Sequence, residues 1–402
     1  MNRKVPEIRF EGFTEDWELR KFFDSIENTI DFRGKTPKKL GLDWSDNGYL
    51  ALSALNVKNG FIDSKADAHY GDQNLYDKWM NGQDLHKGQV LFTTEAPMGN
   101  VAQVPDDQGY ILSQRTIAFK VRAKKMTDNF LAVLLRTPKA FYDLTSLSSG
   151  GTAKGVSQKS LSHFKVIVPK ELKEQQKIGS FFRGLDNLIT LHQRKLENLK
   201  KSKKGFLQKM FPKNGEQVPE IRFDGFTSFW KNRKVSELFT ITRGQVLATN
   251  KTVEKQTKEM PYPVYSSQTK NNGLMGYYKD YLFDTAVTWT TDGANAGTVN
   301  FREGKFYSTN VNGVLLSSEG YANKFVAEAL NRIAWKYVSQ VGNPKLMNNV
   351  MGEILVLLPE NIEEQTQIGN FLKKLDDTIA LQERQLENLK KTKQAFLQKM
   401  FI

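Results

Sequence analysis

The chain has 402 residues, no cysteine, and 58 lysines and arginines against 44 aspartates and glutamates. This length exceeds what one ordinary hydrophobic core supports, so it predicts two or more domains. Without cysteine the chain has no disulfide, thiolate metal ligand or cysteine nucleophile. Its formal net charge of +14 favours a polyanionic partner, most simply nucleic acid. No signal-like apolar run and no apolar stretch of about 18 residues is present, which favours a cytoplasmic protein.

Two kinds of segment occur twice along the chain, and such repeats are a guide to domain organisation. A short lead, VPEIRFEGFTEDW at residues 5–17, returns as VPEIRFDGFTSFW at residues 218–230. A segment of variable sequence and then a long helical segment follow each lead. We therefore divide the chain into an N-terminal lead at 1–18, a first globular domain at 19–170, a central long helix at 171–213, a repeated lead at 214–230, a second globular domain at 231–360 and a C-terminal long helix at 361–402.

Both variable segments are predicted to be α+β. Runs of β-branched and aromatic residues between Gly, Asn and Asp turns predict short strands, and amphipathic runs predict helices. In the first segment we expect strands at 48–57, 89–94, 116–121 and 164–169, and a helix at 129–137 with Asp128 as candidate N-cap. In the second segment we expect strands at 286–291, 311–317 and 353–359, and a helix at 324–338.

The two long helical segments are near copies of each other. Residues 174–211 return at 364–401 without a gap, and 23 of the 38 positions are identical. Apolar residues recur at spacings of three and four, which is the pattern of a coiled-coil seam. Two amphipathic helices in unrelated cores are the alternative, but two near-identical rods in one chain favour packing on each other. The predicted seam is Ile178, Phe182, Leu185, Ile189, Leu196, Leu199 and Phe206 in the first helix, and Ile368, Leu372, Leu375, Ile379, Leu386, Leu389 and Phe396 in the second.

Polar residues interrupt the two seams at matching places. His192 and Gln382 form the first matching pair, and Lys203 and Lys393 form the second. A polar residue inside a seam costs stability but fixes the register and the partner of a helix. The interruptions therefore strengthen the prediction of one specific helix pair.

Loops of similar chemistry fall at equivalent places in the two variable segments: 93–101 with 290–299, 113–115 with 309–310, and 149–154 with 342–345. Glycine lets a backbone approach a ligand closely, and Asn, Gln, Arg and Lys are side chains that read base edges. Each loop alone could be an ordinary turn, but equivalent placement in two divergent segments favours a shared binding face. The candidate DNA-binding residues are Thr93, Thr94, Gln114, Arg115 and Lys154 in the first segment, and Ser267, Gln268, Thr291, Asn295, Asn310 and Lys345 in the second.

The end of the first long helix is strongly basic. Between Arg194 and Lys213 there are eight lysines or arginines and a single acid, Glu197. This run predicts either a contact with DNA phosphates or a solvated helix face.

No catalytic centre is visible in the sequence. A DNA adenine methyltransferase loop needs two adjacent prolines, and none of the 12 prolines is next to another. A phosphate-binding loop needs a glycine five positions before Gly34-Lys35-Thr36, where Thr29 stands instead. The four histidines lie far apart without metal-ligand spacing. We therefore predict neither a catalytic nor a metal site.

At this point the chain resembles the specificity (S) subunits of type I restriction–modification systems. The resemblance covers nearly the whole length and is carried chiefly by the duplicated EQxxIGxF…LD…LENLKK…FLQKMF pattern. The strands that end in Pro169 and Pro359 just before each long helix, and the repeated PEIRF leads, support it.

The resemblance implies two target-recognition domains that each read one half of a split DNA sequence, with the long helices packed antiparallel as a spacer. It implies a non-catalytic chain. Its expected partners are double-stranded DNA, two modification (methyltransferase) subunits and restriction (translocase-nuclease) subunits. The chain would direct adenine methylation and DNA cleavage by these subunits. No cofactor is then expected in this chain, and S-adenosylmethionine, ATP and Mg are expected in the partner subunits. Because the variable segments differ, the target is expected to be asymmetric.

Two other classes of function remain open from the residues alone. A coiled-coil adaptor that bridges two proteins would explain the duplicated helices equally well, although it explains the charge and the polar loops less well. A self-contained DNA-cutting and modifying enzyme conflicts with the missing proline pair and the missing phosphate loop.

Overall fold

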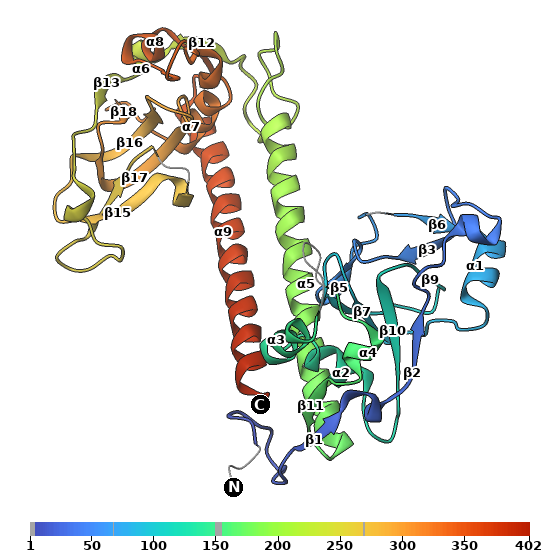
Figure 1. Cartoon of the computed structure of the whole chain (residues 1–402). Coiled ribbons are helices and arrows are strands. Elements are labelled where there is room, and N and C mark those ends of the chain that lie inside the picture. The colour runs from blue at the N-terminus through green and yellow to red at the C-terminus, as the bar shows by residue number, and fades with distance from the viewer. Residues whose placement is uncertain (1–4, 67, 149–154, 268–269) are drawn as a thin grey trace. The chain divides into compact units, whose positions relative to one another are not determined.

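The structure is a computed structural model of the chain, and it describes residues 5–66, 68–148, 155–267 and 270–402. The chain forms two compact units, Met1–Gln193 with Arg384–Ile402, and Arg194–Glu383. Two helices of 38 residues, α5 (Leu172–Lys209) and α9 (Ile362–Lys399), each contribute one half to each unit (Figure 1). The prediction of two long helices is confirmed. Within the described residues, no helix is both long and apolar enough to cross a membrane.

The first unit has short strands and helices before α5. They are β1 (Glu18–Lys21), η1 (Phe22–Ser25), β2 (Ile26–Asp31), η2 (Pro37–Leu40), β3 (Tyr49–Leu52), β4 (Val57–Lys58), β5 (Phe61–Ile62), β6 (Tyr70–Gly71), α1 (Gln73–Met80), β7 (Val90–Thr93), β8 (Val101–Gln103), β9 (Ile111–Leu112), β10 (Thr116–Val121), α2 (Asp128–Leu134), α3 (Pro138–Ser146), α4 (Gln158–Leu161) and β11 (Lys165–Val168).

A four-stranded sheet in the order β2-β10-β7-β8 is the centre of the first globular domain. One of its faces packs with α2 and the start of α5 in a core that contains Trp17, Phe119 and Phe130. The other face is covered by the sheet β6-β3-β9 and by α1, whose Trp79 is 1% exposed (Figure 1). The sheet is therefore buried on both faces, which explains its nearly continuous apolar runs.

Two expectations for this domain are wrong. The expected strand at 48–57 ends at Leu52, because the Asn56 amide donates to the Ala51 carbonyl (2.6 Å) and accepts from the Ser53 N–H (2.8 Å), which forms a turn. The N-cap of α2 is Thr127 rather than Asp128, because the Thr127 hydroxyl accepts a hydrogen bond from the Phe130 N–H (3.3 Å).

The second unit repeats this outline with different elements. They are β12 (Lys231–Lys234), α6 (Val235–Leu238), β13 (Thr240–Arg243), η3 (Thr249–Lys251), β14 (Tyr262–Tyr265), η4 (Lys270–Gly273), β15 (Leu274–Tyr278), β16 (Phe283–Thr290), β17 (Val299–Ser308), β18 (Asn312–Leu316), α7 (Lys324–Asn331), η5 (Ala334–Tyr337), α8 (Asn348–Glu353) and β19 (Leu355–Leu358).

The second domain is built on a six-stranded sheet in the order β13-β18-β16-β17-β14-β15. Its core contains Trp230, Trp289 and Phe325, together with residues from both long helices. Strand β17 was not predicted, because polar residues interrupt its apolar pattern. The expected helix at 324–338 begins where predicted but is shorter: α7 ends at Asn331, whose side chain accepts a hydrogen bond from the Val299 N–H (2.9 Å).

The long helices run antiparallel, because in each unit the start of one packs against the end of the other. In the first unit the rings of Phe181 and Phe396 are 5.1 Å apart, and in the second those of Phe206 and Phe371 are 4.8 Å apart. All fourteen residues of the predicted seam are buried or half-buried.

The lysines that interrupt the seam bind aspartates of the opposite helix. Lys393 Nζ lies 2.5 Å from Asp186 Oδ1 in the first unit, and Lys203 Nζ lies 2.5 Å from Asp376 Oδ1 in the second. A cation of the adjacent globular domain binds the second oxygen of each aspartate: Arg136 at 2.7 Å from Asp186 and Lys324 at 2.9 Å from Asp376. Each aspartate thus connects a helix pair to its domain.

The two ion clusters differ in net charge. Glu328 also binds Lys324 (2.8 Å), so the second cluster has two cations and two anions, whereas the first has two cations and one anion. Burial lowers the pKa of Lys393 in the first cluster, and neighbouring Arg136 lowers it further. In the second cluster burial acts against the charge of Lys324, but Glu328 and Asp376 outweigh it and raise the pKa of this lysine.

A buried glutamate near the start of each long helix binds the lead of its unit. Glu174 is 1% exposed; Arg9 contacts its two oxygens at 2.7 and 2.8 Å, and the Trp17 indole N–H donates to it at 3.2 Å. Glu364 binds Arg222 at 2.7 and 2.8 Å and Trp230 at 3.3 Å. This geometry explains why the leads and the helix starts are repeated together.

The residues that follow each glutamate attach the globular domain to the helix. Gln175 Nε2 donates to the Pro169 carbonyl (3.1 Å), and Gln365 Nε2 donates to the Pro359 carbonyl (2.9 Å). Four residues later, a Cβ atom on Gly179 would lie 2.8 Å from the backbone nitrogen of Phe130 in α2. The repeated EQxxIG pattern therefore holds the domain close to the helix.

We predict that Glu174→Gln lowers the free energy of unfolding of the full chain by about 3 kcal/mol, because half-buried Arg9 would lose its countercharge and the buried site would lose two charge-assisted hydrogen bonds. Denaturant unfolding would measure the loss. Glu171→Gln, three residues earlier at an exposed position, is the matched control and should change stability little. Equal effects of the two substitutions would contradict a structural role of the Arg9–Glu174 pair.

Asp376 should make stability depend on pH. Burial raises the pKa of Asp376, but Lys203 and Lys324 outweigh burial and hold it below the usual value. A depressed carboxyl pKa gives stability that is present above the unfolded pKa of about 3.9 and is lost as the pH falls below it. Asp376→Asn should lower stability at neutral pH and reduce its loss in acid, as urea unfolding at several pH values would measure. The exposed neighbour variant Asp377→Asn should retain the wild-type profile, and an unchanged profile for Asp376→Asn would contradict the prediction.

Candidate nucleic-acid interface

A buried threonine joins three loops in the first domain. The N–H and the hydroxyl of Thr94 both donate to the Arg115 carbonyl, at 2.8 and 3.2 Å. The Thr94 carbonyl accepts from the Val156 N–H at 2.9 Å. The ends of three separate loops, after β7, before β10 and before α4, therefore meet at one residue.

Thr291 joins the corresponding loops of the second domain in the same way. Its N–H and hydroxyl donate to the Val311 carbonyl, both at 3.0 Å, and its carbonyl accepts from the Leu346 N–H at 2.9 Å. The shared hydrogen bonds place Arg115 and Val311 at equivalent positions. Two of the loop pairs that sequence reasoning proposed, 93–101 with 290–299 and 113–115 with 309–310, are thus equivalent in the two domains, although their exposed side chains differ. Residues 149–154 of the third pair lie outside the described residues.

The three threonines named as DNA-facing point inward instead. Thr93, Thr94 and Thr291 are at most 1% exposed. The Thr93 hydroxyl accepts from the Asn100 N–H (2.9 Å), and the other two hydroxyls bind the carbonyls described above. These side chains hold the loops in position and do not face a ligand, which corrects the sequence-based expectation.

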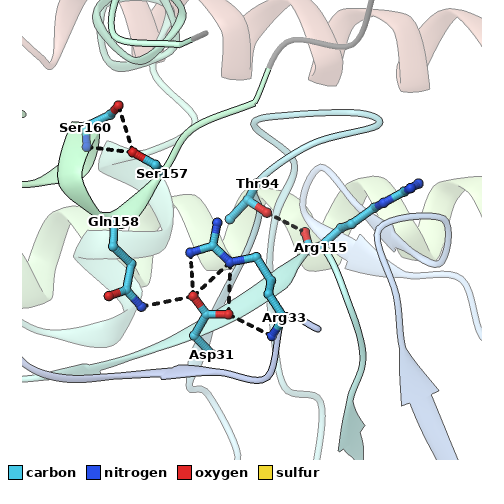
Figure 2. Close-up of polar contacts among 7 residues, drawn as sticks. All are labelled: Asp31, Arg33, Thr94, Arg115, Ser157, Gln158 and Ser160. Atoms are coloured by element: carbon cyan, nitrogen blue, oxygen red, sulfur yellow. Dashed lines mark hydrogen bonds and ion pairs between the residues drawn. The ribbon is translucent and has the colours of Figure 1, made fainter. Parts of the chain in front are cut away.

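Arg115 is an exposed charged group at the meeting point in the first domain. Its side chain is 55% exposed and lies 3.1 Å from Glu95, and its backbone has φ of +64°, which non-glycine residues rarely adopt. Figure 2 shows its guanidinium directed away from the cluster around Asp31. Gln114 is half-buried and donates to the Lys35 carbonyl. A cavity of about 390 Å³ lies beside both residues, with Trp44 and His69 in its wall.

Sequence reasoning missed a second polar cluster of this domain. Arg33 binds both oxygens of Asp31, at 3.0 and 2.5 Å, and the Gln158 amide donates to Asp31 at 2.9 Å (Figure 2). Burial raises the pKa of Asp31, but the hydrogen bonds from Arg33 and Gln158 outweigh it and leave the pKa below its usual value. Asp31 and Gln158 are 127 positions apart in the sequence, so no local pattern could have connected them.

The candidates of the second domain fall into two places. The Asn295 amide donates to the Ser267 carbonyl (3.0 Å), which brings two loops together at the mouth of a cavity of about 90 Å³. Lys345 is exposed and lies 3.9 Å from Asp292, and Asn310 is exposed on the loop before β18. Lys154 and Gln268 lie outside the described residues.

Arg302 of β17 lines the same small cavity and was also missed. No strand was predicted there, so nothing in the sequence indicated which way its side chain points.

The basic end of α5 is partly neutralised within the second unit. Lys200 binds Glu383, Lys203 binds Asp376, and Lys209 and Lys213 both bind Glu220, at 2.5–3.6 Å. Of the eight cations in this run, these four are in ion pairs, so the charge available for DNA phosphates is smaller than the sequence suggests. Within the described part of the chain, no group of His, Asp and Glu side chains could hold a metal ion.

Comparison with known families explains the repeated architecture. The family model of the type I restriction modification DNA specificity domain matches residues 14–201 and again residues 228–391. The two matches cover most of the chain, so the chain belongs to this family.

Individual relatives carry the same description. The N-terminus of a putative type I specificity subunit of Mycoplasma pneumoniae is 42% identical over 129 residues, which are 31% of this chain and 66% of that protein. The specificity subunit of the type I restriction enzyme MpnII of the same organism is 36% identical over 35% of this chain and 42% of its own length. The chain thus spans less than two thirds of these two relatives. A putative type I restriction enzyme MjaX specificity subunit of Methanocaldococcus jannaschii is 23% identical over 95% of this chain and 92% of that protein.

A solved structure has the same fold. The crystal structure of an S subunit of a type I restriction-modification system from M. genitalium superposes with a TM-score of 0.72 over 99% of both chains, at 15% identity. The likeness confirms two mixed α/β domains and a pair of long helices.

Proposed function

We propose that this chain is the non-catalytic DNA-recognition subunit of a type I restriction–modification complex and reads an asymmetric, two-part target. One observation carries the proposal: the same three loops meet at a buried threonine in both domains, yet expose different side chains. A shared frame with different exposed residues suits two readers of two unrelated half-sites. The paired helices serve as the spacer between them.

The exposed and half-buried side chains of the candidate interface have the chemistry that base reading requires. Arg115 and Gln114 offer donors and an amide in the first domain, and Asn295, Asn310 and Lys345 do so in the second. Arginine pairs most often with guanine, and asparagine or glutamine pairs with adenine, through two hydrogen bonds in the major groove. The net charge of +14 supplies the sequence-independent attraction to phosphates.

The partners follow from the same proposal. Methylation, translocation and cleavage belong to modification and restriction subunits, which bind S-adenosylmethionine, ATP and Mg. Leu191 of α5 and Leu381 of α9 occupy equivalent positions of the repeat and are 61% and 49% exposed. Exposed leucines that recur in both copies suit the docking of two copies of one partner, the modification subunit.

The proposal is tested by mapping methylated adenines across the genome in cells with and without this chain. We expect a split, asymmetric motif to be methylated only when the chain is present. An unchanged map would contradict the proposal and favour a protein-bridging adaptor.

Arg115→Ala should weaken or relax recognition of one half-site and leave the other intact. A wrong base at a directly read position typically costs about 1–3 kcal/mol, so the affinity for the target should fall by about tenfold. Binding of the assembled complex to duplexes altered in either half-site would measure this. Arg122→Ala, an exposed arginine after β10, is the control, and equal losses with either altered half-site would count against the role of Arg115.

Leu191→Asp and Leu381→Asp should each remove one modification subunit from the complex, because an acid at an apolar contact is buried without a partner. Co-purification and mass measurement would show one modification subunit per chain for each single variant and none for the double variant. Lys201→Asp introduces the same acid at another exposed position of α5 and should retain both subunits. Full assembly of the double variant would rule out this surface.

A further inference from the structure

Arg302 is a buried cation that has no countercharge within the described ranges. Its residue is 6% exposed, its Nε donates to the Thr288 hydroxyl (3.2 Å), and its guanidinium lies 3.7 Å from the ring centroid of Tyr265. Among the described residues no carboxylate forms an ion pair with it. Burial lowers the pKa of Arg302 to about 10. A desolvated charge without an opposite charge is costly to the fold.

The guanidinium borders a cavity of about 90 Å³ between β16, β17 and the loops of the candidate interface. A water molecule needs roughly 10–15 Å³ by this measure, so the cavity holds a group of several atoms. Hydroxyl and amide side chains surround it, and none of the described residues that line it is a carboxylate. Six of its lining residues are Ser266, Ser267, Thr288, Asn295, Asn300 and Arg302.

At the equivalent place the sheet of the first domain carries apolar side chains. Strands β7 and β8 pair as Leu91 with Ala102, and strands β16 and β17 pair as Thr288 with Asn300. Two positions beyond Asn300 is Arg302, and two beyond Ala102 is Val104. Leu91, Ala102 and Val104 are at most 2% exposed in an apolar core. The shared sheet therefore does not require polar residues on this face. Because burying polar residues lowers the stability of the second domain, their presence points to a ligand.

We propose that the Arg302 cavity binds one phosphodiester group of the DNA backbone beside the half-site that the second domain reads. This inference rests on the proposed function. A guanidinium with hydroxyl and amide donors matches the oxygens of a phosphate, and the absence of carboxylates avoids repulsion. A base edge lies inside a groove and does not reach a recessed cavity, whereas a phosphate projects from the duplex. Ser267 and Asn295 place the cavity at the candidate interface.

The inference makes the two half-sites unequal. The equivalent place of the first domain carries Leu91, Ala102 and Val104. One phosphate near the half-site of the second domain should therefore contribute more to affinity than the phosphate at the matching position near the other half-site. Such a contact fixes the register of the domain on the duplex without reading sequence itself.

The test combines Arg302→Met with target duplexes in which single phosphates are replaced by neutral methylphosphonates. The full chain, assembled with its modification subunits, is titrated with each duplex at several salt concentrations. For the wild type we expect a loss of about tenfold at one position near one half-site. Arg302→Met should bind the unmodified target about as weakly as the wild type binds the duplex neutralised at that position. Neutralising the same phosphate should cause no further loss of affinity for this variant. Its plot of log affinity against log salt should be shallower by about one unit.

Stability separates binding from a structural role. Removal of an unpaired buried charge should leave the melting temperature of the full chain unchanged or higher. Arg243→Met, an exposed arginine at the end of β13, is the control and should leave the loss at the sensitive position intact. A lower melting temperature of Arg302→Met with normal DNA affinity would overturn the proposal. So would a loss confined to duplexes that carry one particular base, because that result assigns the side chain to base reading.

A second readout does not depend on DNA recognition. Inorganic phosphate should raise the melting temperature of the wild-type chain and not that of Arg302→Met. This result would support the cavity even if the chain bound no DNA, in which case the proposed function would fail separately. Equal shifts for both proteins would identify non-specific ion effects and overturn the proposal.

Discussion

The buried carboxylate near the start of each long helix is the contact on which the rest of the structure depends. Glu174 and Glu364 each bind an arginine through two parallel hydrogen bonds and a tryptophan through a third, and both carboxylates are 1% exposed. Loss of one partner would leave a charge buried without compensation. The lead, the helix start and the domain core are therefore joined at one point in each unit, and all three recur in both halves.

Around this constant frame the two domains have diverged. In the first, a second sheet and α1 cover one face of the central sheet with Trp79 and Ile111. In the second, the sheet is extended by β14 and β15, and the equivalent face carries Thr288, Asn300 and Arg302. Despite this difference, buried threonines join the ends of the corresponding loops through the same hydrogen bonds. A constant frame with variable surfaces is what two readers of unlike sequences require.

The charge of the chain is organised at two levels. Lysines within the helix seam bind aspartates of the opposite helix and connect both to the adjacent domain, so part of the positive charge is structural. Arg115, Lys345 and Asn310 remain exposed on the loops. Net charge therefore indicates the class of partner, whereas the position of each cation decides whether it holds the fold together or faces a ligand.

The sequence by itself determined the repeat, the two long helices, their apolar seam and the family, because heptad spacing and near-identical copies are local signals. It also paired the loops at 93–101 and 290–299 correctly, since Thr-Thr and a later Gly recur in both. Only the tertiary structure decided that Thr94 and Thr291 point inward, that Asp31 meets Gln158, and that Arg302 lines a cavity. These facts depend on hydrogen bonds and burial between residues distant in the chain, and no local pattern encodes which face of a short strand or loop becomes covered.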